Sequence, residues 1–382
     1  MSKQDFEPSE FEHRHRQVRK AMEDARIDLL LVISPVNLNY LIGWRGKGYQ
    51  HFQCLFFARD SERLVFVVKL AEKAQVLDET LANEVRTWLQ PDDPLIEVKK
   101  VLEEKNYHRL RIGLEAPAYF LAPQQFLGLR EILGNSLVLD ATYLIENLKL
   151  VKSAPELSYI RKAASLADKG LRSFVNAIEE GRTELEIAAE AHKTMMALGS
   201  DSPASPMNFG SGERSCYAHA LPSERRLKRG DFMHNEFGAA YRRYCATLGR
   251  IMCLGEPTKR MHEIYQAVRQ ASDACIAEIK DGVPAIKPHE AARRVLREFG
   301  MEQYQVHTTG YGIAPGFPPA WGESIQMFRG STATLKAGMV LSVEPPVYIH
   351  EERLGARMID NVVVTETGAE ILSKFTREII CI

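Results

Sequence analysis

Two stretches of sequence decide the fold: LKRGDFMHNEFGAAY at residues 227–241 and LKAGMVLSVEPPVY at residues 335–348. Each begins with the pattern LKxG and carries a glutamate six residues after the glycine, Glu236 in the first and Glu344 in the second. Each reads as an apolar run of the length of a β-strand. Two strands with the same start and the same acidic position indicate an internal duplication of the chain.

The sequence before each stretch repeats as well. Two helical patterns precede the first stretch, at residues 154–198, and two precede the second, at residues 258–299. Duplicated halves are related by a pseudo-twofold axis, which would bring Glu236 and Glu344 into one shared site. Chance is the alternative explanation, because LKxG is common before strands.

The first part of the chain follows a different pattern, in which helical and strand signals alternate. Residues 28–33 (DLLLVI) predict a buried strand. A helix start follows at residues 153–156 (SAPE), with a serine N-cap, a proline in the first turn and a glutamate three residues on. We therefore predict a mixed α/β domain over residues 1–150 and a second domain over residues 151–382.

The composition of the 382 residues argues against several classes of protein. Lysine and arginine number 49 and aspartate and glutamate number 50, so no net basic charge attracts nucleic acid or an anionic membrane. No apolar run reaches the ~18 residues of a membrane helix, and the N-terminus lacks the apolar core of a signal peptide. Six scattered cysteines without a CxxC pair are typical of reduced thiols. We expect a cytoplasmic protein with no nucleic-acid or membrane partner.

Polar side chains on strands that otherwise resemble core indicate where the chemistry lies, because an unpaired buried charge is costly. Glu236 and Glu344 lie in apolar strand patterns. His219 lies in the segment CYAHA, and His307 and Tyr311 lie in VHTTGYGI. Two carboxylates with one or two imidazoles form a workable acid–base set. The alternative for each residue is a hydrogen-bonded group of the core.

Four motifs, in order, resemble those of the creatinase, prolidase and aminopeptidase P family, whose architecture is called the pita-bread fold. The family's GD-x4-D-x-G segment resembles residues 230–250, and its H-x-x-G-H-G motif resembles HTTGYGIA at residues 307–314. Its G-M-x4-E-P motif resembles residues 337–348, and its R-x-E-D strand resembles GARMIDNVVVTETG at residues 355–368. The resemblance covers nearly the whole chain. It implies an N-terminal creatinase-type α/β domain, a duplicated catalytic domain with a pseudo-twofold antiparallel sheet, and a homodimer.

The same resemblance locates the metal-ligand positions of the family's peptidases. Their two aspartates, one histidine and two glutamates fall here on Glu236, Thr247, Tyr311, Glu344 and Ile359. Only two of these five residues are carboxylates, and isoleucine replaces a carboxylate that would bridge two ions. We therefore expect no two-metal centre and no other cofactor, with one loosely held ion as the alternative.

The chain resembles the metal-free members of the family. Ectoine hydrolase is the closer resemblance, through Glu236, His219 and the segment GFPPAWGE at residues 316–323. Creatinase is the second, through His219 and Glu344. Both families act on compounds in which nitrogens flank an amidinium or guanidinium carbon. The resemblance therefore implies a small zwitterionic or cationic substrate.

Chemistry and resemblance together suggest a role for each catalytic candidate. Glu236 would attack the amidinium carbon or activate the attacking water. His219 would carry the proton to the leaving nitrogen, and Glu344 would hold the amidinium. His307 and Tyr311 would orient the substrate or stabilise the tetrahedral intermediate. Which glutamate attacks is left open.

Further residues are predicted to contact the substrate. Trp321 and Glu323 belong to a loop that a double proline stiffens, and a tryptophan face attracts a cation. A lid that packs against the neighbouring domain is the alternative. Arg357 would bind a substrate carboxylate or neutralise the acidic residues beside it. Thr247 lies at a former ligand position, where substrate would take the place of metal.

Three functions follow, in this order of preference. The first is a metal-independent hydrolase that cleaves a C–N bond of an amidine-type or guanidino-type compound. The second is an Xaa-Pro peptidase with a degenerate metal site. The third is a non-catalytic binding protein on the same scaffold, which the presence of two histidines and two glutamates in one inferred site argues against. A lyase acting on a similar zwitterion is a further alternative.

Overall fold

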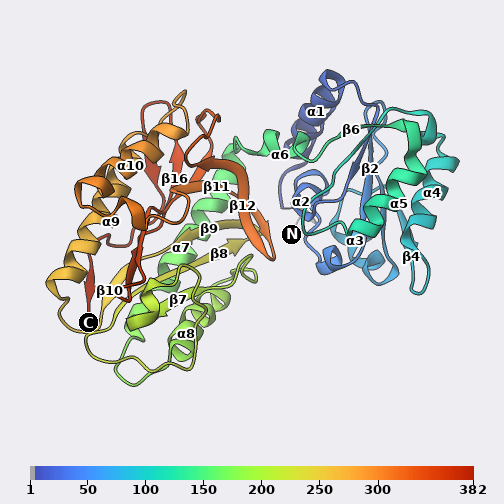
Figure 1. The fold of residues 1–382 in the computed structure, drawn as a ribbon. Coiled ribbons are helices and arrows are strands. Elements are labelled where there is room, and N and C mark those ends of the chain that lie inside the picture. Colours follow the sequence, from blue (N-terminus) through green and yellow to red (C-terminus); the bar gives the residue numbers. More distant parts are fainter. Residues whose placement is uncertain (1–4) are drawn as a thin grey trace. The chain divides into compact units, whose positions relative to one another are not determined.

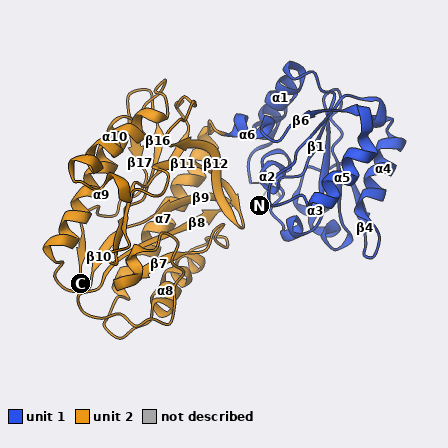
Figure 2. Ribbon diagram, in the orientation of Figure 1, with its two compact units in different colours: residues 1–149 blue, residues 150–382 orange. Residues whose placement is uncertain are grey.

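The computed structural model describes residues 5–382, which form two compact units (Figures 1 and 2). The first unit extends to residue 149 and the second begins at residue 150. Each unit has its own sheet and its own hydrophobic core. No helix within residues 5–382 is long and apolar enough to cross a membrane.

The first unit alternates helices and strands along the chain. In chain order these elements are α1 (Pro8–Asp24), β1 (Leu29–Val32), α2 (Pro35–Ile42), β2 (Cys54–Ala58), β3 (Val65–Lys69), α3 (Lys73–Glu79), β4 (Glu84–Trp88), α4 (Pro94–Glu104), β5 (Ile112–Leu114), α5 (Pro123–Leu133), β6 (Leu137–Asp140) and α6 (Leu144–Lys149).

A six-stranded mixed sheet in the order β4-β3-β2-β1-β5-β6 forms the centre of this unit. β2 runs antiparallel to both of its neighbours, and the remaining pairs are parallel. Successive residues of β1 face opposite sides of the sheet. Leu29 and Leu31 therefore join the core beneath α4 and α5, whereas Leu30 and Val32 join the core beneath α1, α2 and α6. Burial on both faces explains the continuous apolar run of this strand.

A buried carboxylate lies at the N-terminal end of α2. Glu115 Oε2 accepts hydrogen bonds from the backbone N–H groups of Ile33 at 2.8 Å and Ser34 at 3.0 Å. Glu115 Oε1 accepts one from Asn37 Nδ2 at 2.7 Å. Such donors favour the ionised carboxylate, as does the positive end of the helix dipole. Burial has the larger effect and raises the pKa of Glu115 to about 7.

We predict that Glu115 makes the stability of the protein depend on pH. The stabilisation from its protonated form is complete below the ordinary pKa of 4.5 and is lost as the pH rises through about 7, because the unfolded chain ionises first. The free energy of unfolding of wild type should therefore fall by about 3 kcal/mol relative to that of Glu115→Gln between pH 4.5 and 8. Urea unfolding of both proteins at the two pH values measures this. An equal change in both proteins would contradict it.

The second unit consists of two halves, each with a pair of helices followed by strands. In chain order its elements are α7 (Ala154–Asn176), α8 (Glu184–Ala197), β7 (Asn208–Ser211), β8 (Phe232–Tyr241), β9 (Tyr244–Leu248), β10 (Ile251–Cys253), α9 (Lys259–Ala277), α10 (Ile286–Glu298), β11 (Gly310–Phe317), β12 (Ala320–Met327), β13 (Val340–Val343), β14 (Pro346–Ile349), β15 (Leu354–Arg357), β16 (Asp360–Val364), β17 (Ala369–Ile371) and β18 (Ile380–Cys381).

A large sheet in the order β17-β16-β13-β11-β9-β8-β10-β18 runs through this unit, and all of its neighbours are antiparallel except β10 and β18. β7 adds to β8, and β12 adds to β11. The two halves meet where Tyr244 of β9 pairs with Pro315 of β11. Glu236 lies in β8 and Glu344 directly follows β13, so only β9 and β11 separate their strands in the sheet.

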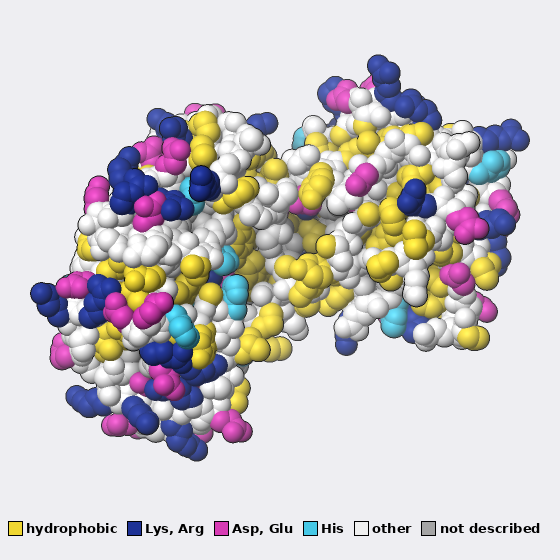
Figure 3. All heavy atoms as spheres, viewed as in Figure 1, with side chains coloured by type: hydrophobic (Ala, Val, Ile, Leu, Met, Phe, Trp, Pro, Cys, Tyr) yellow, Lys and Arg dark blue, Asp and Glu magenta, His cyan; other side chains and the backbone are white. Residues whose placement is uncertain are grey.

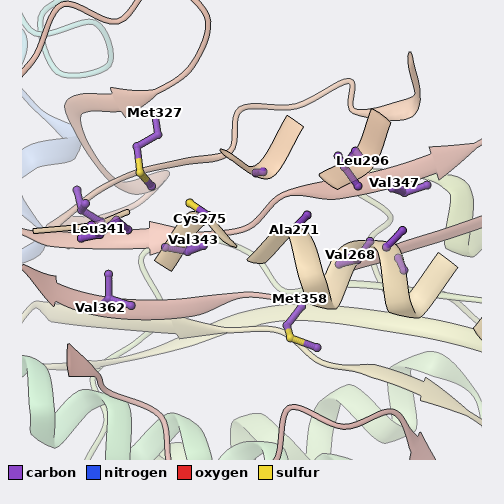
Figure 4. Packing of buried hydrophobic residues seen from close by; sticks show 14 of the residues in the cluster. Val268, Ala271, Cys275, Leu296, Met327, Leu341, Val343, Val347, Met358 and Val362 are labelled. Carbon is purple, nitrogen blue, oxygen red and sulfur yellow. The ribbon is translucent and has the colours of Figure 1, made fainter. Parts of the chain in front are cut away.

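Each half of the second unit has its own core beneath its own pair of helices. Residues of α7 and α8 pack against β7, β8 and β9, and residues of α9 and α10 pack against β12, β13, β14, β15 and β16. Figure 4 shows part of the latter cluster, which includes Val268 and Ala271 of α9 and Val343 of β13, with Cys275 of α9 beside Val343. The strand that precedes Glu344 is thus held by close apolar packing.

These observations confirm the predicted fold class. The first unit is a mixed α/β domain. The second contains a large antiparallel sheet, and in each half of its sequence two long helices precede the strands. The predicted helix start is present as well: Ser153 Oγ accepts a hydrogen bond from the N–H of Glu156 at 3.4 Å, and Glu156 Oε2 accepts one from the N–H of Ser153 at 2.8 Å.

Candidate active site

Glu236 lies in the interior of the second unit and is bonded on two sides. Its carboxylate accepts a hydrogen bond from Asn208 Nδ2 at 2.6 Å, because Asn208 of β7 pairs directly with Glu236 of β8. Arg357, at the end of β15, donates to the same carboxylate oxygen. Arg357 is itself fully buried, and its Nη2 also donates a hydrogen bond to the carbonyl oxygen of Ala218 at 3.3 Å.

Glu344 faces the same guanidinium. Its Oε1 lies 4.0 Å from Arg357 Nη1, and its Oε2 accepts a hydrogen bond from Ser342 Oγ at 2.9 Å. Glu344 has no exposed surface. Burial, and next the negative charge of Glu236, raise the pKa of Glu344 although Arg357 opposes this shift. The arrangement therefore holds two carboxylates around one cation.

Two histidines lie on the solvent side of these carboxylates. His307 Nδ1 is 3.5 Å from Glu344 Oε1, and the ring of His219 lies edge-on to that of His307 with centroids 5.5 Å apart. His219 is exposed, whereas His307 is partly buried. Burial and the charge of Arg357 lower the pKa of His307, which favours a neutral imidazole able to accept a proton.

Tyr311 and Trp321 come from neighbouring strands and are joined by a hydrogen bond. Trp321 Nε1 donates to the Tyr311 hydroxyl at 3.2 Å. Burial and the charges of Glu344 and Glu236 raise the pKa of Tyr311, so the phenol remains protonated. The predicted loop over residues 316–323 was wrong: these residues lie mostly in the β11–β12 hairpin, with prolines at its turn.

Glu323 is paired with a lysine from the start of the second unit. Lys152 Nζ donates to Glu323 Oε2 at 2.6 Å, and both side chains are almost fully buried. Strand alternation on β12 buries Trp321 and Glu323 alike, since they are two residues apart. The ion pair gives Glu323 a structural role whether or not it also reaches substrate.

We predict that Lys152→Met lowers the free energy of unfolding by about 3–5 kcal/mol, because it leaves Glu323 buried without its cation. The double variant Lys152→Met/Glu323→Gln should recover most of that loss. Urea unfolding of both variants measures the effect. A substrate-binding role alone would instead show as a higher KM in Glu323→Gln with unchanged stability.

The other former ligand positions are taken up by interactions within the sheet. The Thr247 hydroxyl accepts a hydrogen bond from Asn361 Nδ2 at 3.0 Å, and its N–H donates to Asn361 Oδ1 at 2.5 Å. Ile359 is fully buried, and its backbone exchanges two hydrogen bonds with Gly249. The hydrogen bonds of Thr247 and Ile359 thus connect the C-terminal end of β9 to the N-terminal end of β16.

The residues at the five ligand positions do not fit a pair of metal ions. Ile359 offers no donor atom, and Tyr311 presents a protonated phenol. Arg357 already supplies positive charge to both remaining carboxylates. Within residues 5–382, no three His, Cys, Asp or Glu side chains are grouped to hold an ion.

We therefore predict that the protein does not retain a pair of divalent ions. After incubation with Mn²⁺ and gel filtration, metal analysis should find fewer than two Mn²⁺ per chain, because a two-ion centre needs bridging carboxylates. Recovery of two Mn²⁺ per chain from wild type, and their loss from Glu236→Gln, would contradict this prediction.

Sequence reasoning missed two residues that touch the carboxylates. Ser342 could have been found, since it precedes Glu344 by two residues and strand alternation places both on one face. Asn208 carries no signal of this kind, because its contact with Glu236 depends on the pairing of β7 with β8. Direct contacts and the shared guanidinium bring together seven of the candidates, namely His219, Glu236, His307, Tyr311, Trp321, Glu344 and Arg357.

The two units match two family models. Residues 158–366 match metallopeptidase family M24, and residues 14–151 match the creatinase/prolidase N-terminal domain. The chain belongs to metallopeptidase family M24, a family of hydrolases.

Particular relatives match along almost the whole chain. The Xaa-Pro dipeptidase of Pyrococcus furiosus is 28% identical over 363 residues, which cover 94% of this chain and 97% of the relative. The structure of an Xaa-Pro dipeptidase from Bacillus anthracis is 26% identical, with a TM-score of 0.84 and coverage of 97% and 100%. That of dipeptidase PepE from Mycobacterium ulcerans is 29% identical, with a TM-score of 0.85 and coverage of 98% and 99%. These names correct the expected order of resemblance, in which ectoine hydrolase came first.

Proposed function

We propose that the protein is a hydrolase that cleaves a C–N bond of a small cationic or zwitterionic compound without a two-metal centre. The observation that carries the proposal is the single guanidinium between two buried carboxylates. The positive charge of Arg357 compensates one of the two carboxylates, Glu236 and Glu344, and a cationic ligand would compensate the other. Burial, and next the negative charge of Glu236, raise the pKa of Glu344, and a substrate with one positive charge would favour its ionised form.

In the proposed reaction each residue has one step. Glu344 would bind the cationic nitrogens of the substrate through charge-assisted hydrogen bonds. Glu236 would attack the electrophilic carbon, or activate the water that does so, and the bond from that carbon to the leaving nitrogen then breaks. A proton reaches the leaving nitrogen through His219 and His307, which connect the buried carboxylates to solvent.

An Xaa-Pro dipeptide is the second candidate substrate, and the names of the relatives favour it. Such a dipeptide also carries one positive charge, on its ammonium group, so the same charge deficit accommodates it. The two candidates differ in the carbon that is attacked, which is an amide carbon in the dipeptide and an amidinium or guanidinium carbon in the other compounds.

A substrate panel separates the candidates. Chelator-treated protein is incubated with ectoine, creatine and Xaa-Pro dipeptides, and mass spectrometry follows the products. Turnover of an amidine-type compound without added metal is expected. Turnover of dipeptides alone, and only after Mn²⁺ is restored, would overturn the proposal in favour of a metal-dependent dipeptidase.

We predict that Glu236→Gln lowers kcat by about 10²–10⁴-fold, because it removes the group that attacks or activates water. The far-ultraviolet circular dichroism should remain that of wild type. Glu351→Gln, at an exposed position, is the matched control and should keep full activity. Near-normal turnover in Glu236→Gln would rule out this role.

A further inference from the structure

A second cluster of charged side chains lies outside the candidate active site. It surrounds a cavity of about 520 Å³ in the second unit, formed by α10 and by the segments that follow α10 and β12. Figure 3 shows Lys and Arg side chains gathered on the surface over α10. The charged residues that line the cavity are Glu290, Arg293, Arg294, Arg297, Glu302 and Arg329.

The cavity has an excess of positive charge that the protein does not neutralise. Glu302 accepts hydrogen bonds from Arg293 at 2.9 Å and from Arg297 at 2.7 and 2.8 Å. Arg294 and Arg329 form no hydrogen bond or ion pair with any part of the chain that the structure describes. Two guanidinium groups therefore remain available to a ligand.

A buried histidine lies at the wall of the cavity. His289 lines the cavity and is only 6% exposed. Its Nδ1 lies 2.7 Å from Thr309 Oγ1, whereas its Nε2 has no hydrogen-bond partner within residues 5–382. This nitrogen is almost inaccessible to solvent, so His289 shapes the wall of the cavity and the arginines carry the contacts to a ligand.

We propose that this cavity binds the phosphoryl group of a small phosphomonoester. A phosphoryl dianion matches the two uncompensated charges of Arg294 and Arg329, and guanidinium forks bind its oxygens in pairs. The volume exceeds that of a phosphate ion and leaves room for an organic part. This proposal does not depend on the function proposed for the active site.

Isothermal titration calorimetry tests the site with glucose 6-phosphate and with inorganic phosphate, at constant ionic strength. We expect saturable binding of one glucose 6-phosphate per chain and weaker binding of inorganic phosphate. Arg294→Gln/Arg329→Gln should weaken binding at least about tenfold, since two charge-assisted hydrogen bonds are lost. Both arginines are exposed, so the variant is expected to fold.

The control is Arg109→Gln/Arg229→Gln, which removes the same charge at exposed positions outside the cavity and should bind like wild type. Equal affinity in Arg294→Gln/Arg329→Gln and wild type would overturn the proposal. So would the absence of saturable binding, or binding of the dicarboxylate succinate as tight as that of glucose 6-phosphate.

Discussion

The candidate active site depends on the placement of one buried guanidinium. Arg357 lies at the end of β15, which pairs only with β14 in a small ladder beside the main sheet. This position lets Arg357 donate to Glu236 of one half of the second unit while it lies 4.0 Å from Glu344 of the other. Without it, two buried carboxylates would face each other uncompensated, at a cost of several kcal/mol. The duplicated sheet brings the two carboxylates close together, and the positive charge of Arg357 lowers the energetic cost of burying them side by side.

The same charge balance is the basis of the proposed substrate class. One guanidinium faces two carboxylates, and the proposal assigns the remaining negative charge to a cationic substrate. The histidines extend the cluster toward solvent, since His307 is near Glu344 and His219 is exposed beside it. The membership in metallopeptidase family M24 thus coexists with a residue set that differs in its chemistry from a two-metal centre.

The sequence was most informative where periodicity and repetition carry the signal. The paired LKxG stretches predicted the duplicated antiparallel sheet, and a capping box predicted the start of α7. Contacts between distant segments could not be predicted in the same way. Lys152 meets Glu323 across 171 positions of sequence, and Asn208 meets Glu236 through strand register. Trp321 and Glu323 were expected to lie in a loop stiffened by a double proline, yet the prolines occupy a hairpin turn and both residues lie in β12.

The buried position of Ile359 has a consequence for how this chain could change over evolutionary time. A return to a two-ion centre would require at least new carboxylates at positions 247 and 359 and an imidazole at position 311. Each single step is unfavourable by itself. An acid at position 359 would be fully buried, and loss of the Tyr311 phenol would leave the Trp321 indole without its acceptor. No single substitution completes a two-ion centre, so each one would cost stability before the metal site could form.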